Sequence, residues 1–158
     1  MLFHNIQKNK GFTLLELIVV IAILVILSGV IIGAFVIFNT TEGVNKDTEL
    51  VLETLRLARN QTLASKNEMQ YGVHFSATNI TLFSGATYNP STSGNEIFAL
   101  HAGDSLSVNL NSGGDDVVFD RLTGATSESG TITITSSNSA TSKNVTIYST
   151  GLIQGPSL

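Results

Sequence analysis

The apolar residues of this chain are concentrated in one block close to its N-terminus. From Phe12 to Phe38 only five residues are not hydrophobic, and Glu16 is the only charged one among them. The 22 uncharged positions that follow Glu16 would extend about 33 Å as an α-helix, which matches the ~30 Å hydrocarbon core of a bilayer. A helix that is apolar on every face is typical of a membrane span, so we predict a transmembrane helix over residues 12–38.

Helical periodicity resumes after a short stretch of poor helix formers, residues 39–43. One side of the second helical segment carries the apolar residues Val44, Val51, Leu55 and Ala58. Six charged residues between Lys46 and Arg59 lie among the remaining positions. This spacing predicts an amphipathic helix over residues 39–66, whose apolar stripe packs against the segments that follow.

Beyond Asn67 the pattern changes from helical to alternating, as in strands with one buried face. Loops rich in Ser, Thr, Asn and Gly separate the alternating segments. We predict strands at Tyr71–Phe75, Ile80–Leu82, Ile97–His101, Leu106–Leu110, Val117–Asp120, Thr131–Thr135 and Val145–Tyr148. A long helix followed by short strands predicts the α+β class: an N-terminal helix, with a transmembrane half and an amphipathic half, packed on antiparallel β-sheets. Residues 67–158 would form this β-rich head.

Charge and cysteine content exclude several classes of protein. The 158 residues carry a net charge of −4, and only Arg121 and Lys143 are basic after residue 67, which argues against DNA binding. There are no cysteines, so disulfides, Cys-ligated metal sites and thiol catalysis are excluded. Lys8 and Lys10 precede the apolar block, and the positive-inside rule therefore predicts a cytoplasmic N-terminus and a head outside the membrane. The block is too long for a secretory signal peptide, and no Ala-x-Ala site follows it.

Glu16 stands near the start of a predicted membrane helix, where an acidic side chain requires a partner. The run KGFTLLEL (residues 10–17) resembles the type III signal of type IV pilins and type II secretion pseudopilins. The resemblance implies that residues 1–11 are a leader removed by a prepilin peptidase, which cuts after Gly11 and methylates the new N-terminal amine of Phe12. It also implies that Glu16 is an assembly carboxylate, neutralised by the N-terminal amine of a neighbouring subunit.

A second resemblance lies at the end of the amphipathic helix. The run LRLARNQTLA (residues 55–64) is similar to the helix end of minor pseudopilin H and FimT-like subunits, whose heads are two small sheets packed on the helix. It implies a structural, non-enzymatic minor subunit of a type II secretion pseudopilus or type IV pilus, with no cofactor. Two alternatives stay open: a major pilin of a surface filament, and a membrane-anchored binding module that is never processed.

The family resemblance also implies where the subunit works and what it contacts. We expect a single-pass protein of the cytoplasmic (inner) membrane that later enters a periplasmic or extracellular filament. Its partners would be other (pseudo)pilin subunits, the prepilin peptidase, the inner-membrane assembly platform and membrane lipid. The sequence leaves open whether the machine secretes proteins, takes up DNA or forms a surface pilus.

One short motif suggests hydrolysis, but the rest of the chain does not support it. The run GDSL (residues 103–106) is the signature of an esterase family in which Ser105 would be the nucleophile. That chemistry needs a base within hydrogen-bonding reach, and the family places its histidine near the C-terminus, whereas no histidine follows His101 here. We interpret the run as a turn that enters a strand.

A cluster of acidic residues raises the question of a metal site. Asp115, Asp116 and Asp120 lie around a glycine turn, and carboxylate oxygens are what calcium prefers. No EF-hand spacing is present, so we interpret these residues as surface acids. His74 and His101 are isolated in strand patterns and are interpreted as ordinary strand side chains. The sequence therefore predicts no metal site.

Overall fold

A computed structural model describes residues 11–137 and 141–156 of the chain. The side chains of these residues are described except for Val36, Ile37 and Thr40. By its internal contacts the chain divides into two units, residues 1–38 and residues 39–158. Helix α1 (Leu14–Leu63) begins in the first unit and ends in the second.

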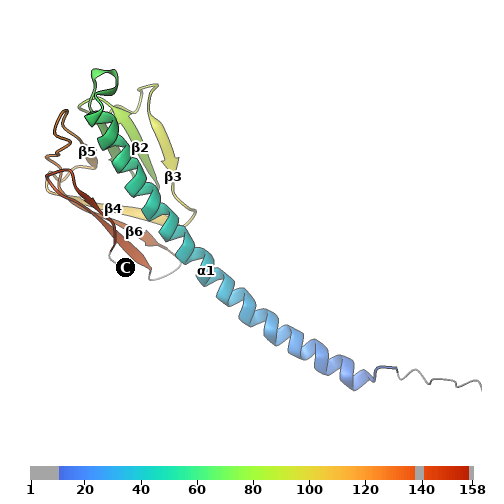
Figure 1. Cartoon of the computed structure of the whole chain (residues 1–158). Coiled ribbons are helices and arrows are strands. Elements are labelled where there is room, and N and C mark those ends of the chain that lie inside the picture. Colours follow the sequence, from blue (N-terminus) through green and yellow to red (C-terminus); the bar gives the residue numbers. More distant parts are fainter. Residues whose placement is uncertain (1–10, 138–140, 157–158) are drawn as a thin grey trace, which may run out of the picture. The chain divides into compact units, whose positions relative to one another are not determined.

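The first unit contains the N-terminal part of α1, coloured blue in Figure 1. Its segment Leu14–Phe35 has a mean hydropathy of 3.2, and none of its most apolar stretch is buried within the chain. No other helix in the part of the chain that the structure describes is long and apolar enough to cross a membrane. The predicted apolar span is therefore helical, and other residues of this unit do not cover its described side chains.

The second unit packs the remainder of α1 against two four-stranded sheets. The first sheet has the order β3-β2-β1-β5 and is built from β1 (Tyr71–Phe75), β2 (Asn79–Ser84), β3 (Glu96–Ala99) and β5 (Asp116–Val118). The second has the order β4-β6-β7-β8 and is built from β4 (Asp104–Leu110), β6 (Gly130–Ser136), β7 (Ser142–Ile147) and β8 (Ile153–Gln154). All paired strands are antiparallel, which confirms the predicted α+β class.

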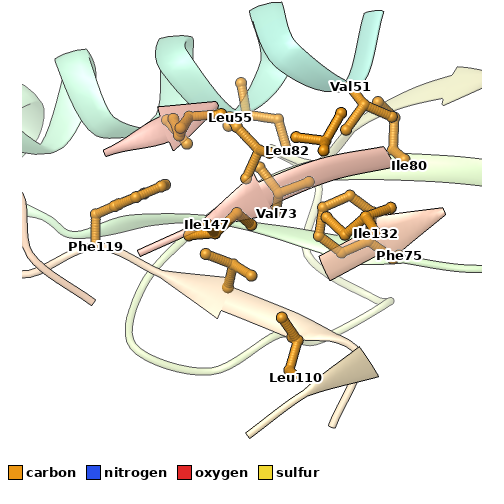
Figure 2. Close-up of a cluster of buried hydrophobic side chains, with 14 of the residues drawn as sticks. Val51, Leu55, Val73, Phe75, Ile80, Leu82, Leu110, Phe119, Ile132 and Ile147 are labelled. Carbon is orange, nitrogen blue, oxygen red and sulfur yellow. The ribbon is translucent and has the colours of Figure 1, made fainter. Parts of the chain in front are cut away.

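The core of the second unit lies between α1 and both sheets. The apolar stripe of the helix is completely buried at the four predicted positions Val44, Val51, Leu55 and Ala58. Figure 2 shows Val51 and Leu55 pointing from α1 into a cluster of strand residues. That cluster combines residues of the first sheet, such as Val73, with residues of the second, such as Ile132 and Ile147. Burial of this shared apolar surface holds the helix and the two sheets together.

The helix is continuous through its centre, as predicted, and differs from the prediction at its C-terminal end. Residues 39–43 are poor helix formers, yet they lie within α1. Tertiary packing of the next turn, where Val44 is fully buried, outweighs this low propensity. At the other end α1 stops at Leu63 instead of residue 66, because Ser65 adopts a left-handed backbone with φ 48°. The short 3₁₀ helix η1 (Lys66–Glu68) then leads into β1.

The predicted strands are present: Tyr71–Phe75 has the predicted bounds, and each of the others is shifted at one end or both. The strand predicted at 117–120 runs from Asp116 to Val118, and the short strand β8 was missed. Two-residue strands carry too little alternation to be recognised, and the position of β8 depends on pairing with β7. The end of α1 is joined to the sheet by the backbone N–H of Tyr71, which donates to Thr62 Oγ1 at 2.8 Å.

Candidate functional sites

The N-terminal end of α1 gathers the residues that the sequence places at the processing site. Gly11, Phe12, Thr13 and Glu16 line one hollow of about 390 Å³. Residues 11–13 precede the helix, and no atom of the described residues lies within 4 Å of the position that a Cβ would take at Gly11. The Gly11–Phe12 peptide is therefore an open, non-helical backbone, the form in which a protease can bind a chain. The predicted leader residues 1–10 lie outside the described residues.

Glu16 occupies the first turn of α1. Its backbone N–H donates to Thr13 Oγ1 at 3.2 Å, so Thr13 is the N-cap of the helix. The Leu17 N–H donates to the Thr13 carbonyl at 3.1 Å, which closes the first helical turn. A carboxylate in this position faces the positive end of the helix dipole. The capped turn thus fixes the backbone of Glu16 three residues after Thr13, beside the hollow that Phe12 also lines.

A second group of polar residues connects the edge strand β5 to β1. His74 Nδ1 lies 2.6 Å from Asp116 Oδ1, and Ser76 Oγ lies 3.3 Å from His74 Nε2. Because a carboxylate can only accept, the imidazole donates from Nδ1, and in the neutral ring Nε2 then accepts from the serine hydroxyl. Tyr88 stacks on the imidazole at a centroid distance of 3.9 Å. His74 was predicted to be an ordinary strand residue, but it is the centre of a hydrogen-bonded network that fastens β5 to the sheet.

A third group lies where α1 meets the loop between β3 and β4. Asp47 on α1 and Asp104 at the start of β4 are both buried. Asp47 Oδ2 accepts the backbone N–H of His101 at 2.9 Å, and His101 Nδ1 lies 4.0 Å from Asp47 Oδ1. Burial raises the pKa of the Asp47 carboxyl, the hydrogen bond from His101 opposes this, and the Asp104 carboxyl raises the pKa further. The sequence did not predict this pair, because only the packing of distant segments brings the two carboxylates together.

The acids considered for calcium are used separately. Asp116 binds His74, Asp120 Oδ1 accepts from Gln70 Nε2 at 3.4 Å, and Asp115 is exposed. Within residues 11–137 and 141–156, no three His, Cys, Asp or Glu residues are arranged to hold a metal ion. The turn around these acids therefore has no geometry of a metal centre.

The GDSL run lies at the start of β4. Gly103 takes φ +94°, and Asp104 and Ser105 are already part of the strand. Ser105 Oγ donates to the Thr135 carbonyl at 3.5 Å on the exposed side of the sheet. The interpretation as a turn that enters a strand is confirmed, except that the strand begins two residues before Leu106.

Basic residues of the second unit are distributed over separate surfaces. Arg56 and Arg59 line a hollow of about 330 Å³ beside Leu152, whereas Lys143 lines another of about 460 Å³ between β7 and β8. Arg59 Nε donates to the Gly124 carbonyl at 3.0 Å, so this arginine stabilises the loop that contains Gly124. The expectation that the subunit does not bind DNA stays a prediction.

Comparisons with known proteins match two parts of the chain. A family model described as type II transport protein GspH matches residues 47–151, which is more than half of the chain. A model described as the prokaryotic N-terminal methylation motif matches residues 6–32. No curated protein and no solved structure matches the chain significantly. The first match covers the head, and the second covers the predicted processing site together with most of the apolar span.

Proposed function

The chain belongs to the GspH family of type II transport proteins, and from that premise we infer that it is a minor pseudopilin, a structural subunit that enters a filament through the N-terminal half of α1. One observation carries this inference. The head of the family is joined to an apolar helix of membrane-spanning length, whose described side chains are exposed and which is preceded by the methylation motif. A pilin-type subunit needs all three parts, whereas an isolated binding domain needs only the head.

Processing comes first in this proposal. A prepilin peptidase removes residues 1–11 by cutting the Gly11–Phe12 peptide, and the new amine of Phe12 is methylated. The open backbone at Gly11 and the helix start after Thr13 support this site, because the bond to be cut lies outside the hydrogen-bonded helix. Residues 14–38 of α1 then act as the membrane and assembly part of the helix, residues 39–63 are its amphipathic part, and the strands that follow complete the head.

The amine of Phe12 and the carboxylate of Glu16 give the assembly step its chemistry. A carboxylate at the edge of an apolar helix is costly when it is unpaired, and a neighbouring subunit can supply a positive charge at the same depth. The Phe12 amine stays positively charged after methylation. Polymerisation therefore supplies Glu16 with a cationic partner from a second subunit.

Location follows from the same helix. The apolar span anchors the protein in the cytoplasmic membrane, with the N-terminus in the cytoplasm and the head outside. From there the subunit passes into a periplasmic or extracellular filament together with other (pseudo)pilins and with the inner-membrane assembly platform.

Mass spectrometry of the mature N-terminus tests the proposal. We expect a chain that begins with methylated Phe12 when the prepilin peptidase is present, and an uncut chain when Gly11 is replaced by Val. An intact N-terminus in the presence of the peptidase would contradict the proposal and favour an unprocessed membrane-anchored module. A subunit that is as abundant as the main component of sheared filaments would instead indicate a major pilin.

A further inference from the structure

Two buried carboxylates lie where α1 meets the start of β4, and the proposed function assigns a role to neither. Asp47 and Asp104 expose only 3% and 6% of their surface, and they come from elements far apart in the sequence. Burying one ionised carboxylate is costly, and two in contact repel each other. Such a pair is stable in a folded protein when a proton or another positive charge neutralises one of the two carboxylates.

The helix is shaped to let Asp104 approach. Gly43 lies one turn before Asp47 on the same face of α1. A Cβ at Gly43 would lie 3.0 Å from Asp104 Oδ2 and 3.5 Å from the Cβ of His101. The absence of a side chain at this position therefore makes the space in which both residues rest against the helix.

The hydrogen bonds at this contact leave one acceptor oxygen without a donor. Asp47 Oδ2 accepts the backbone N–H of His101, whereas Asp104 Oδ2 is buried without a hydrogen-bond partner among the described residues. An ionised Asp47 has no proton to offer to this oxygen. A protonated Asp47 has one, and its hydroxyl would donate to Asp104 Oδ2 and satisfy the open acceptor.

The other charged groups do not remove the need for a proton. Besides Asp104, the ionisable group that acts on Asp47 is His101, in the loop between β3 and β4. Its ring is about half exposed, and Nδ1 lies 4.0 Å from Asp47 Oδ1, beyond hydrogen-bonding distance. The imidazole contributes a distant attraction that solvent screens, so the buried pair depends mainly on its own protonation.

We propose that Asp47 and Asp104 share one proton and form a pH-dependent clasp, which holds the β3–β4 loop (residues 100–103) on α1. With the proton in place, one carboxyl donates to the other. When the proton leaves, two like charges lie side by side in a buried contact and push the loop away from the helix. The clasp is therefore tight in acidic surroundings and loose in alkaline ones.

The direction of the pH effect follows from the pKa of Asp47. Burial and the neighbouring Asp104 raise it above the ordinary value of 3.8, so the folded head holds the proton more tightly than the unfolded chain does. The contribution to stability is complete below the ordinary pKa and is lost as the pH rises through the raised pKa. Acidification thus strengthens the clasp, the opposite of the usual effect on a carboxylate in an ion pair.

Thermal unfolding of the full-length protein in detergent tests the clasp. Circular dichroism would follow the head between about pH 4 and pH 8 for the wild type, for Asp104→Asn and for the control Asp115→Asn. The amide introduced by Asp104→Asn carries its own donor and no charge. As the pH rises over this range, the melting temperature of the wild type and of the exposed control should therefore fall by roughly 3 °C more than that of Asp104→Asn. An equal fall in all three proteins would overturn the proposal.

Two further measurements keep the test decisive if Asp104→Asn does not fold. In wild-type protein with ¹³C-labelled aspartate, the Asp47 carboxyl, assigned with Asp47→Asn, should titrate with a pKa above the ordinary value of 3.8. Titration of Asp47 at the ordinary value would contradict a shared proton. Calcium added at the upper end of the pH range should leave the melting temperature unchanged, and a calcium-dependent rise would show that the pair holds a metal ion instead.

Discussion

Both halves of α1 carry large apolar side chains, but only the C-terminal half buries them within the chain. In the second unit Val51 and Leu55 are fully covered by the chain's own strands. In the first unit Leu24 and Val25 stay 56% and 67% exposed. Exposed apolar surface costs about 25 cal/mol for each Å² that could be buried, so the N-terminal half is suited to lipid or to neighbouring helices. The head can therefore fold by its own contacts, whereas the other half is completed only by its surroundings.

The acidic residues of the same helix repeat this contrast. Asp47 is buried in the head, and its neighbours His101 and Asp104 belong to the same chain. Glu16 lies in the exposed first turn, where its described contacts are those of the helix cap. One carboxylate is an internal component of the fold, and the other is, in our proposal, available to a second subunit.

The largest expected difference comes from the same truncation in each half of the helix. Leu55→Ala removes a completely buried side chain and should lower the free energy of unfolding of the head by about 2–5 kcal/mol. Leu24→Ala, the matched control, should change it by less than ~0.5 kcal/mol, because Leu24 is exposed and belongs to the first unit. Urea unfolding followed by circular dichroism measures both, and equal losses would mean that the apolar half is part of the folded core.

An arginine placed in each half tests membrane insertion, and here the larger effect is expected in the N-terminal half of α1. Leu24→Arg puts a guanidinium near the middle of the apolar span and should disfavour membrane insertion by about 2.5–3.5 kcal/mol. Leu57→Arg, on a partly exposed face of the helix, should insert like the wild type. Alkaline extraction of membranes separates inserted from peripheral protein. Release of the wild type by alkaline extraction would argue against a membrane span.

Glycine substitutions sharpen the comparison at the level of packing. A Cβ at Gly72 in β1 would lie 2.7 Å from Phe83 Cζ and 2.8 Å from the Val117 carbonyl oxygen, so Gly72→Ala should destabilise the head by about 1–3 kcal/mol. Nothing lies within 4 Å of the corresponding position at Gly33. Gly33→Ala should therefore leave head unfolding unchanged and favour the local helix by up to ~1 kcal/mol. A stable Gly72→Ala protein would show that β1 and β5 can separate at little cost.

The smallest expected effect concerns the His74–Asp116 contact. Asp116→Asn weakens a charged hydrogen bond at the edge strand β5 and should cost about 1 kcal/mol, an amount limited by the partial exposure of Asp116. The adjacent Asp115→Asn serves as its control, since Asp115 is exposed. Hydrogen exchange of the β5 amides should rise in the first variant only. Equal exchange in both would mean that backbone pairing alone holds β5.

Local patterns predicted the elements of this fold well. The buried stripe Val44–Ala58 and the strand around Val73 follow from spacing that each segment carries by itself. The helix was predicted to include residues 39–43 despite their low propensity, and the packing of the next turn stabilises it there. The two-residue strand β8 was missed because so short a strand carries too little alternation.

The side-chain networks could not be predicted because they depend on register. His74 and Asp116 become partners only through the pairing of β1 with β5, and they lie 42 positions apart in the sequence. Asp47 meets Asp104 only when α1 docks on the start of β4. By contrast, the processing site and Glu16 were predicted because their pattern is contiguous, and their roles stay predictions until they are measured.

Filament incorporation of Glu16→Ala tests the central claim most directly. The amounts of wild type, Glu16→Ala and the exposed head variant Glu49→Ala would be compared in sheared filaments from cells with equal membrane levels of each protein. We predict that Glu16→Ala is cleaved and inserted normally, yet its incorporation falls roughly tenfold or more, a loss of at least about 1.4 kcal/mol, while Glu49→Ala behaves as wild type. Incorporation of Glu16→Ala at the wild-type level would contradict the account.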